Sequence, residues 1–243
     1  MLPLPPHSTR LALWNMLLQR RSLLIWLAIA SGGAEAQLAP STTEQAAYRG
    51  LHSAAQRGDL AALRQAWAGT GDVNVRDGHG RTPVHVATFA RQREAIKALA
   101  AAGAKLGLLE NDRYDAVTIA SVADDEETLR VLLALGASAK LITSRYDGTA
   151  LIAAAHLGHD GVVRQLIAAG APLDHVNNLH WTAVIEAIVL GDGGTRHQAT
   201  LKALIDAKAN PQLADRSGRT PLALARERGY AAMVKMLATA GAR

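Results

Sequence analysis

The side chains with the greatest capacity for chemistry are histidines: the chain has 9 of them and no cysteine. Without cysteine, a disulfide framework, a thiol nucleophile and a thiolate-bound metal are excluded. His156 and His159 lie three residues apart, a spacing that can place two imidazoles on one face of a helix as metal ligands. No third ligand accompanies them, so we expect a structural role for both and no metal site.

Haem ligation is a second use to which histidine could be put. His79, His175 and His180 are candidates for an axial ligand if their imidazoles are exposed. The Cys-x-x-Cys-His attachment motif is missing, and spacing alone does not define an axial ligand. We therefore expect no cofactor, and a carrier of haem or of a small ligand is kept as the alternative function.

Motifs of the common enzyme classes are missing. The sequence has no Gly-x-Ser-x-Gly elbow, no His-Glu-x-x-His pair and no Gly-x-x-x-x-Gly-Lys loop. Residues 72–78 resemble a calcium loop, but Arg76 occupies the fifth position, where an oxygen ligand is needed. The acidic residues 124–127 suit a helix N-terminus, whose dipole favours negative charge. We predict a protein that is not an enzyme.

The composition indicates the elements that must position these side chains. Of 243 residues, 49% are hydrophobic and only 4% aromatic, so the chain can form a core, but from small side chains. Alanine has the highest helix propensity and lets backbones approach closely. The composition therefore predicts an all-α fold.

The first 36 residues have the pattern of a secretory signal peptide. Arg10, Arg20 and Arg21 precede an apolar run of eight residues, 23–30, which is followed by small side chains. A spanning helix needs about 20 apolar residues, so an anchor is the weaker interpretation. We expect cleavage between Ala36 and Gln37, a periplasmic location, and contact with the membrane only during export.

Two details of this segment leave alternatives open. Met16 begins a stretch that is itself a complete signal peptide, so translation could start there. Arg20 and Arg21 also fit a twin-arginine signal, although general secretion is the expected route. Removal of residues 1–36, which hold three arginines and one glutamate, lowers the net charge from +5 to +3. This small excess of positive charge does not favour nucleic acid as a partner.

A repeat of about 33 residues organises the rest of the chain. Gly71, Gly103, Gly136 and Gly170 are separated by 32, 33 and 34 residues, and each follows an apolar stretch. Glycine directly after such a stretch ends a helix, because it adopts the left-handed conformation without steric cost.

A second marker recurs upstream of helix ends of this kind. Thr82, Thr149, Thr182 and Thr220 can cap the first turn of a helix, and two of them are followed by proline, which suits the first helical position. Turn-forming residues stand before them. Each unit is therefore predicted to be a turn, a helix, a short loop and a second helix.

These markers together resemble the ankyrin repeat. Its pattern of Asp, Gly, Thr-Pro-Leu-His, Ala-Ala, Gly-His, Val-Val and Gly-Ala is carried by Asp77, Gly80, Thr82, Pro83, His85, Ala87, Gly103 and Ala104, and by Thr149, Ala154, Ala155, Gly158, His159, Val162, Val163, Gly170 and Ala171. The resemblance implies a solenoid over residues 44–243 after a linker at 37–43. Its expected units are 44–76, 77–111, 112–144, 145–177, 178–214 and 215–243.

Three departures from the pattern stand out. Residues 117–120 replace Thr-Pro-Leu-His in the third unit, and Lys208 replaces the helix-ending glycine of the fifth. We expect both units to be looser than the others. Residues 191–195 lengthen the fifth unit and are expected to form an inserted, mobile loop.

The resemblance also implies roles for particular side chains. His52 and His85 fall where imidazoles of the family bond the turn backbone between adjacent units, and His159 falls where the ring supports the turn between helices. The turn tips and inner helices would line a concave surface that binds a partner protein. The predicted contacts are His79, Arg81, Arg113, Tyr114, Arg145, Tyr146, His180, Trp181 and Arg216.

Two Arg-Tyr pairs, at 113–114 and 145–146, favour binding, because arginine and tyrosine are enriched at interaction hot spots. In the alternative interpretation these side chains only pack on neighbouring turns. The predicted function is a non-enzymatic, monomeric periplasmic scaffold that holds another protein. The resemblance implies two roles for such binding, because exported bacterial proteins of this family include ones associated with catalase and others that serve as immunity partners of secreted toxins.

Overall fold

The computed structural model describes residues 39–243; the predicted signal peptide and the cleavage site at Ala36 and Gln37 lie outside them. The described residues form thirteen helices and two short strands. None of these helices is long and apolar enough to cross a membrane. The helices are α2 (Thr42–Ala47), α3 (Gly50–Arg57), α4 (Leu60–Thr70), α5 (Pro83–Phe89), α6 (Arg93–Ala101), α7 (Ala116–Val122), α8 (Glu126–Ala134), α9 (Ala150–Leu157), α10 (Asp160–Ala168), α11 (Ala183–Val189), α12 (Thr195–Asp206), α13 (Pro221–Glu227) and α14 (Ala231–Thr239).

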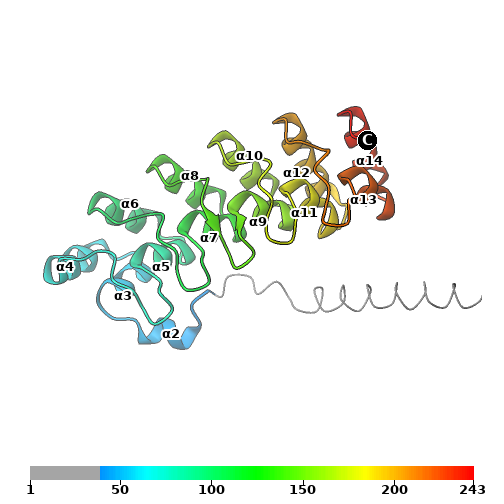
Figure 1. Ribbon diagram of the computed structural model, residues 1–243. Coiled ribbons are helices and arrows are strands. Elements are labelled where there is room, and N and C mark those ends of the chain that lie inside the picture. Colours follow the sequence, from blue (N-terminus) through cyan, green and yellow to red (C-terminus); the bar gives the residue numbers. More distant parts are fainter. Residues whose placement is uncertain (1–38) are drawn as a thin grey trace, which may run out of the picture. The chain divides into compact units, whose positions relative to one another are not determined.

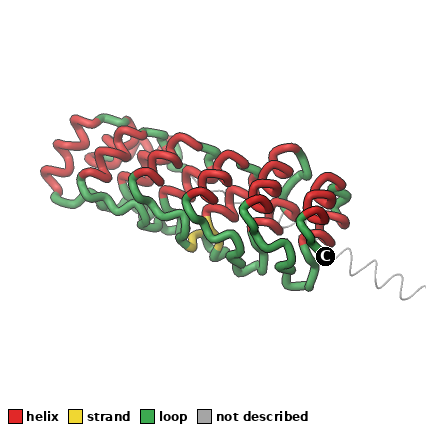
Figure 2. Tube along the Cα trace, turned by 90° about the horizontal axis from the view of Figure 1, so that it is seen from above, coloured by secondary structure: helices red, strands yellow, loops and turns green. Residues whose placement is uncertain are grey.

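Six antiparallel helix pairs stack side by side within residues 39–243. One layer holds the first helices of the pairs, α3, α5, α7, α9, α11 and α13, and the other holds the second helices, α4, α6, α8, α10, α12 and α14 (Figure 1). Seen from above, the connecting hairpins project along one side of the layers (Figure 2). The fold is the all-α solenoid that the repeat predicted, and each expected unit contains one helix pair.

Helical periodicity explains how the layers pack. In α6, Ala95, Ile96 and Leu99 share one face and are fully buried. Leucine and isoleucine side chains at matching positions of the other pairs form a continuous core, so each pair depends on its neighbours for burial. These core residues include Leu63, Leu129, Leu132, Leu151, Leu166, Ile185, Leu201 and Leu204.

Capping residues start the helices at the expected places. The hydroxyls of Thr149, Thr182 and Thr220 accept hydrogen bonds from backbone amides of the first turn of α9, α11 and α13. Asp115 does the same for α7. In the third unit, Asp115 therefore occupies the capping position that threonine occupies in most of the other units. The repeat pattern placed Val117 there, so the predicted register of this unit was wrong by two residues.

The glycines of the repeat end helices in left-handed backbone conformation. Gly103, Gly136 and Gly170 have φ of 88°, 87° and 77°. Lys208 follows α12 with φ 73°, so it takes the same conformation despite its side chain. The third and fifth units, which we expected to be looser, thus have the same complete helix pair as their neighbours.

The predicted linker and the predicted loop differ from the structure. Ser41 caps α2 in a capping box with Glu44, so helix begins within the segment assigned to a linker, 37–43. In the fifth unit, the extra residues lengthen α12 to 12 residues. The remaining loop is hydrogen-bonded on both sides, by Tyr230 to the Gly191 carbonyl at 2.8 Å and by His197 to Asp192 at 2.8 Å.

Ion pairs also join neighbouring helix pairs. They lie near the short loops that connect the two helices within each helix pair. Arg93 pairs with Asp125 of the next pair at 3.2 Å. Arg196 of α12 reaches Asp160 at 3.4 Å and Asp124 at 2.9 Å. Because Asp124 precedes α8 and Asp160 belongs to α10, Arg196 links three successive helix pairs.

Candidate partner-binding surface

Five hairpins, which we call fingers, connect the helix pairs and carry the predicted contact residues. The fingers are residues 77–81, 110–114, 143–148, 177–181 and 215–219. In four of them, an anchor side chain at the first residue accepts backbone hydrogen bonds from the residues two and four positions later. The anchors are Asp77, Glu110, Asn177 and Asp215. These bonds fix the shape of each finger.

Neighbouring fingers are joined by backbone hydrogen bonds. The Asn111 amide donates to the His79 carbonyl at 3.0 Å, Ser144 donates to Arg113 at 3.0 Å, and Asn178 donates to Tyr146 at 2.9 Å. Four successive fingers are therefore locked into one surface, on which the spacing of side chains is fixed.

The 143–148 finger is one residue longer than the others and lacks the anchor. Its ends pair as strands β1 (Ile142–Thr143) and β2 (Gly148–Thr149), with Ile142 opposite Thr149. Backbone hydrogen bonds also close the four anchored fingers, so in this finger the backbone pairing acts without a side-chain anchor. Tyr146 projects from it with a half-exposed side chain.

The fingers do not align the two Arg-Tyr pairs as predicted. Arg113 occupies the left-handed position that Gly80 and His180 occupy in other fingers, with φ of 67°, 73° and 63°. Tyr114 is the finger's last residue and is half-buried, and burial raises its pKa. The 113–114 pair is thus out of register with Arg145 and Tyr146, because Asp115 is the true helix cap.

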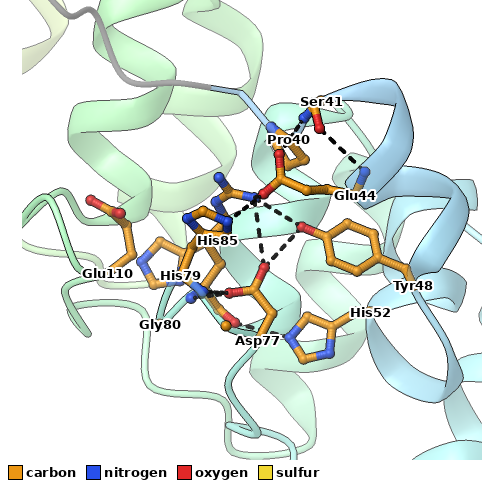
Figure 3. A network of polar contacts seen from close by, with 12 residues as sticks. Pro40, Ser41, Glu44, Tyr48, His52, Asp77, His79, Gly80, His85 and Glu110 are labelled. Atoms are coloured by element: carbon orange, nitrogen blue, oxygen red, sulfur yellow. Dashed lines mark hydrogen bonds and ion pairs between the residues drawn. The ribbon is translucent and has the colours of Figure 1, made fainter.

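Arg81 was predicted as a contact residue, but its side chain is buried and does not lie on the predicted surface. Its guanidinium donates to Glu44 at 2.9 Å and to the Tyr48 hydroxyl at 3.2 Å, and Tyr48 donates to Asp77 at 3.0 Å (Figure 3). His79 Nε2 lies 2.7 Å from the same Glu44 carboxylate. These contacts attach α2 to the first finger.

The electrostatics of this cluster fit a structural role. Hydrogen bonds from Ser41, and then from Arg81, hold the pKa of Glu44 at about 2. Burial raises the pKa of Tyr48 to about 12. Neither group changes its charge state in the physiological range, so the contacts of Glu44 and Tyr48 with Arg81 do not depend on pH there.

The arginines of the two Arg-Tyr pairs form ion pairs with aspartates of neighbouring fingers. Arg113 Nη1 lies 2.8 Å from Asp147, and Arg145 Nη2 lies 3.2 Å from Asp112. Both pairs are about half exposed, so each contributes little to stability. Arg216 donates to the Asn178 carbonyl at 2.9 Å. Packing on neighbouring fingers, the alternative interpretation, therefore accounts for part of what these side chains do.

The fingers also carry exposed apolar side chains, of which the predicted contact set named Tyr146 but not the others. The described residues have five well-exposed large apolar side chains, and four of them lie on two adjacent fingers or directly before them. These are Ile142, Tyr146, Val176 and Leu179, with 48%, 50%, 42% and 38% exposure. We call them the apolar patch. Trp181, which ends the second of these fingers, is partly exposed.

The histidines have mostly structural contacts. His52 and His159 each bond a backbone carbonyl of an adjacent unit at 2.9 Å, and His85 bonds the Leu108 carbonyl of its own unit at 2.9 Å. Two of the three haem candidates are engaged as well, His79 by Glu44 and His175 by the Asp147 carbonyl at 2.6 Å. Within residues 39–243, no group of three or more metal-ligating side chains comes together.

One buried carboxylate was not anticipated. Glu186 of α11 is 4% exposed, and burial raises its pKa to about 7. Its Oε1 accepts a hydrogen bond from Asn177 Nδ2 at 3.0 Å, while its buried Oε2 has no hydrogen-bond partner among the described residues. Nothing in the sequence pattern indicates this site, because the position is usually apolar in this chain.

Stacked helix pairs with aligned fingers define a class of solenoid that presents an extended binding surface. A sequence profile of the ankyrin repeat family, described as three copies of the repeat, matches residues 51–143 and 151–243. The chain therefore belongs to the ankyrin repeat family. Its repeats make it a protein–protein interaction scaffold in the general sense of that family, whose members are mostly binding proteins without enzymatic activity.

Relatives support this assignment over most of the chain. The ankyrin repeat protein YahD of Escherichia coli K12 is 35% identical over 190 residues, 78% of this chain and 94% of its own. An ankyrin repeat domain from Acinetobacter baumannii is 42% identical with a TM-score of 0.75, covering 79% of this chain and 98% of that one.

Two further matches are more restricted. A chain from the complex of the Bdellovibrio bacteriovorus endopeptidase Bd0816 with the immunity protein Bd3460 shares the fold, with a TM-score of 0.62 and 24% identity over 79% of this chain and 98% of that one. The L-asparaginase of Dirofilaria immitis is 28% identical over 70% of this chain but only 28% of its own length, so its activity does not transfer.

Proposed function

We propose that this protein is a non-enzymatic scaffold of the bacterial periplasm that binds one partner protein on the fingers around the apolar patch. The observation that carries the proposal is the concentration of exposed apolar side chains on two adjacent fingers. Large exposed apolar groups are uncommon on monomeric proteins and mark interaction sites when they cluster. Tyr146 adds a hydroxyl to its apolar surface, as interface anchors do.

The arginines around the patch complete this proposal. Arg113 and Arg145 are held by ion pairs with neighbouring fingers, so they lose little freedom when a partner binds. The partner would meet a rigid apolar centre with a polar rim, which is the usual anatomy of a protein interface. Support of a periplasmic enzyme or neutralisation of a toxin are the two roles that we propose for such binding.

Affinity capture with matched variants tests the surface. We expect a periplasmic extract to yield one protein that the native chain retains and that Tyr146→Ala with Leu179→Ala loses. Removal of hot-spot side chains weakens binding by more than about 2 kcal/mol, or more than about thirtyfold. Both side chains are exposed, so the melting temperature should stay within the small range that surface substitutions cause.

The control uses Leu135, the cap residue of α8, which is the fifth well-exposed apolar side chain and lies outside the fingers. Leu135→Ala should leave capture unchanged. Equal retention by the patch variant and the native chain would overturn the assignment of the surface. Cleavage is tested separately: N-terminal sequencing of the exported protein should begin at Gln37.

A further inference from the structure

The buried Glu186 carboxylate is connected directly to one of the two fingers of the apolar patch. Asn177 anchors the 177–181 finger, because its side-chain oxygen accepts hydrogen bonds from the backbone amides of Leu179 and Trp181, both at 3.0 Å. The amide group of the same side chain donates to Glu186 Oε1 at 3.0 Å. Asn177 and Glu186 are both 4% exposed.

This connection is specific to the 177–181 finger. The other anchored fingers use Asp77, Glu110 and Asp215, and a carboxylate accepts hydrogen bonds but has no amide to donate. Asparagine can do both at once. Asn177 therefore couples the conformation of the finger to the protonation state of Glu186.

The two protonation states of Glu186 differ in how well this site satisfies them. A protonated Oε2 is a donor, and His156 Nδ1 lies 3.7 Å away as an acceptor within reach of a small rotation. Burial and the nearby His197 and His159 lower the pKa of His156, which favours the neutral imidazole that can accept a hydrogen bond. An ionised Oε2 is a buried charge without a donor, which is strongly unfavourable.

The charged groups on the surrounding elements do not compensate this charge. Glu186 is the one charged residue of α11, and His156 is the titratable group of α9 that faces it. On α12, Arg196 pairs with Asp124 and His197 bonds Asp192. The last turn of α13 and its cap carry Arg226, Glu227 and Arg228, which are exposed, and Glu227 pairs with Arg219 at 3.2 Å.

We propose that loss of the Glu186 proton releases the 177–181 finger, so that protons regulate the partner-binding surface. The ionised carboxylate reaches water only by moving out of its buried position, and this movement removes Oε1 from Asn177. The anchor then loses its own support, and the finger that carries Leu179 and Trp181 opens more often. With a pKa of about 7 in the folded state, the change falls in the neutral range.

Hydrogen exchange of the full chain measures this opening without any partner. Each amide that an anchor holds exchanges only when its finger opens. In the open form Glu186 has its ordinary pKa, so linkage predicts that the protection factors of the Leu179 and Trp181 amides fall about tenfold between pH 6 and pH 8. These factors are corrected for the intrinsic pH dependence of exchange.

Glu186→Gln is the matched variant, because glutamine keeps the acceptor for Asn177 and offers His156 a permanent donor. Its 177–181 finger should remain equally protected at both pH values. The Ser217 and Arg219 amides, which Asp215 holds, serve as the internal control and should not change in either chain. A carbon-13 titration of the Glu186 carboxyl gives an independent midpoint, expected near pH 7.

Equal loss of protection in the native chain and in Glu186→Gln, or no loss in the native chain, would overturn the inference. Regulation of binding rests on the proposed function, but the coupling itself does not. A finger that switches in a chain that captures no protein contradicts the proposed function alone. Capture through Tyr146 and Leu179 with no difference between the two chains in exchange contradicts the coupling alone.

Discussion

At the scale of single residues, Glu186 weakens the fold at neutral pH. Its folded-state pKa is raised from 4.5 to about 7, so the folded protein holds this proton more tightly than the unfolded chain does. The stability that the neutral carboxyl provides is complete below pH 4.5 and is lost as the pH rises towards 7. Residues kept at such a cost are often functional.

Glu186→Gln should therefore stabilise the protein, and by an amount that depends on pH. We expect a gain in the free energy of unfolding of about 3 kcal/mol at pH 8 and almost none at pH 4.5. Urea denaturation at the two pH values measures it. A gain that is the same at both would show that ionisation of Glu186 is not its cause.

The sequence predicted which residues cap and end the helices more reliably than it predicted which finger residues are buried. The threonine and glycine markers located the caps, because capping depends on a few residues close in sequence. Arg81 and Tyr114 were misplaced, because burial of a finger residue depends on α2 and on neighbouring fingers. The aspartate at 115, a cap as good as threonine, is what shifted the register of the third unit.

At the scale of elements, Lys208 shows how a helix can end without the preferred residue. The backbone there is left-handed with φ 73°, as it is at Gly103, Gly136 and Gly170. A residue with a Cβ adopts this conformation at a cost of about 1 to 2 kcal/mol. The helix pair still forms, because packing against neighbouring pairs outweighs this cost.

Lys208→Gly should stabilise the protein by about 1 kcal/mol, since it removes the strain but adds freedom to the unfolded chain. Thermal unfolding or urea denaturation measures the gain. The reverse change, Gly170→Lys, should destabilise by a similar amount at the equivalent position. Stabilisation by Lys208→Ala equal to that by Lys208→Gly would show that backbone conformation is not the reason.

The fifth unit shows what a sequence can and cannot reveal about an insertion. Its extra length was visible as a wider spacing between the threonine and the helix end. That the added residues would extend α12 could not be read from the spacing. The outcome depends on Tyr230 and His197, which hold the remaining loop from a neighbouring pair and from α12 itself.

At the scale of the whole molecule, the repeat period predicted the solenoid, and the order of its helix pairs followed. The apolar patch could not be predicted in the same way. Ile142 and Val176 belong to apolar types that are usually buried, and only the stacking of the fingers decides that they remain exposed. The surface is a property of neighbouring units together.

Ion pairs between helix pairs should make stability depend on salt. Arg196→Met removes contacts to Asp124 and Asp160 and should lower the free energy of unfolding by at most about 1 kcal/mol at low ionic strength. The loss should disappear in about 1 M salt, where charges are screened within about 3 Å. Denaturation at both salt concentrations measures it, with Lys202→Met, whose pair lies within α12, as the control. A loss that persists in high salt would contradict an electrostatic origin.

The reach of Arg196 has a consequence for the modularity of the chain. In a solenoid whose units touch only their neighbours, a single unit can be removed, duplicated or exchanged if the two adjoining faces match. Arg196 depends on Asp124, two helix pairs away, at a distance that the intervening pair fixes. Removal or exchange of a single unit between α8 and α12 therefore breaks a contact of Arg196 that would survive if the segment moved as a whole, and the fingers of the apolar patch lie within that segment.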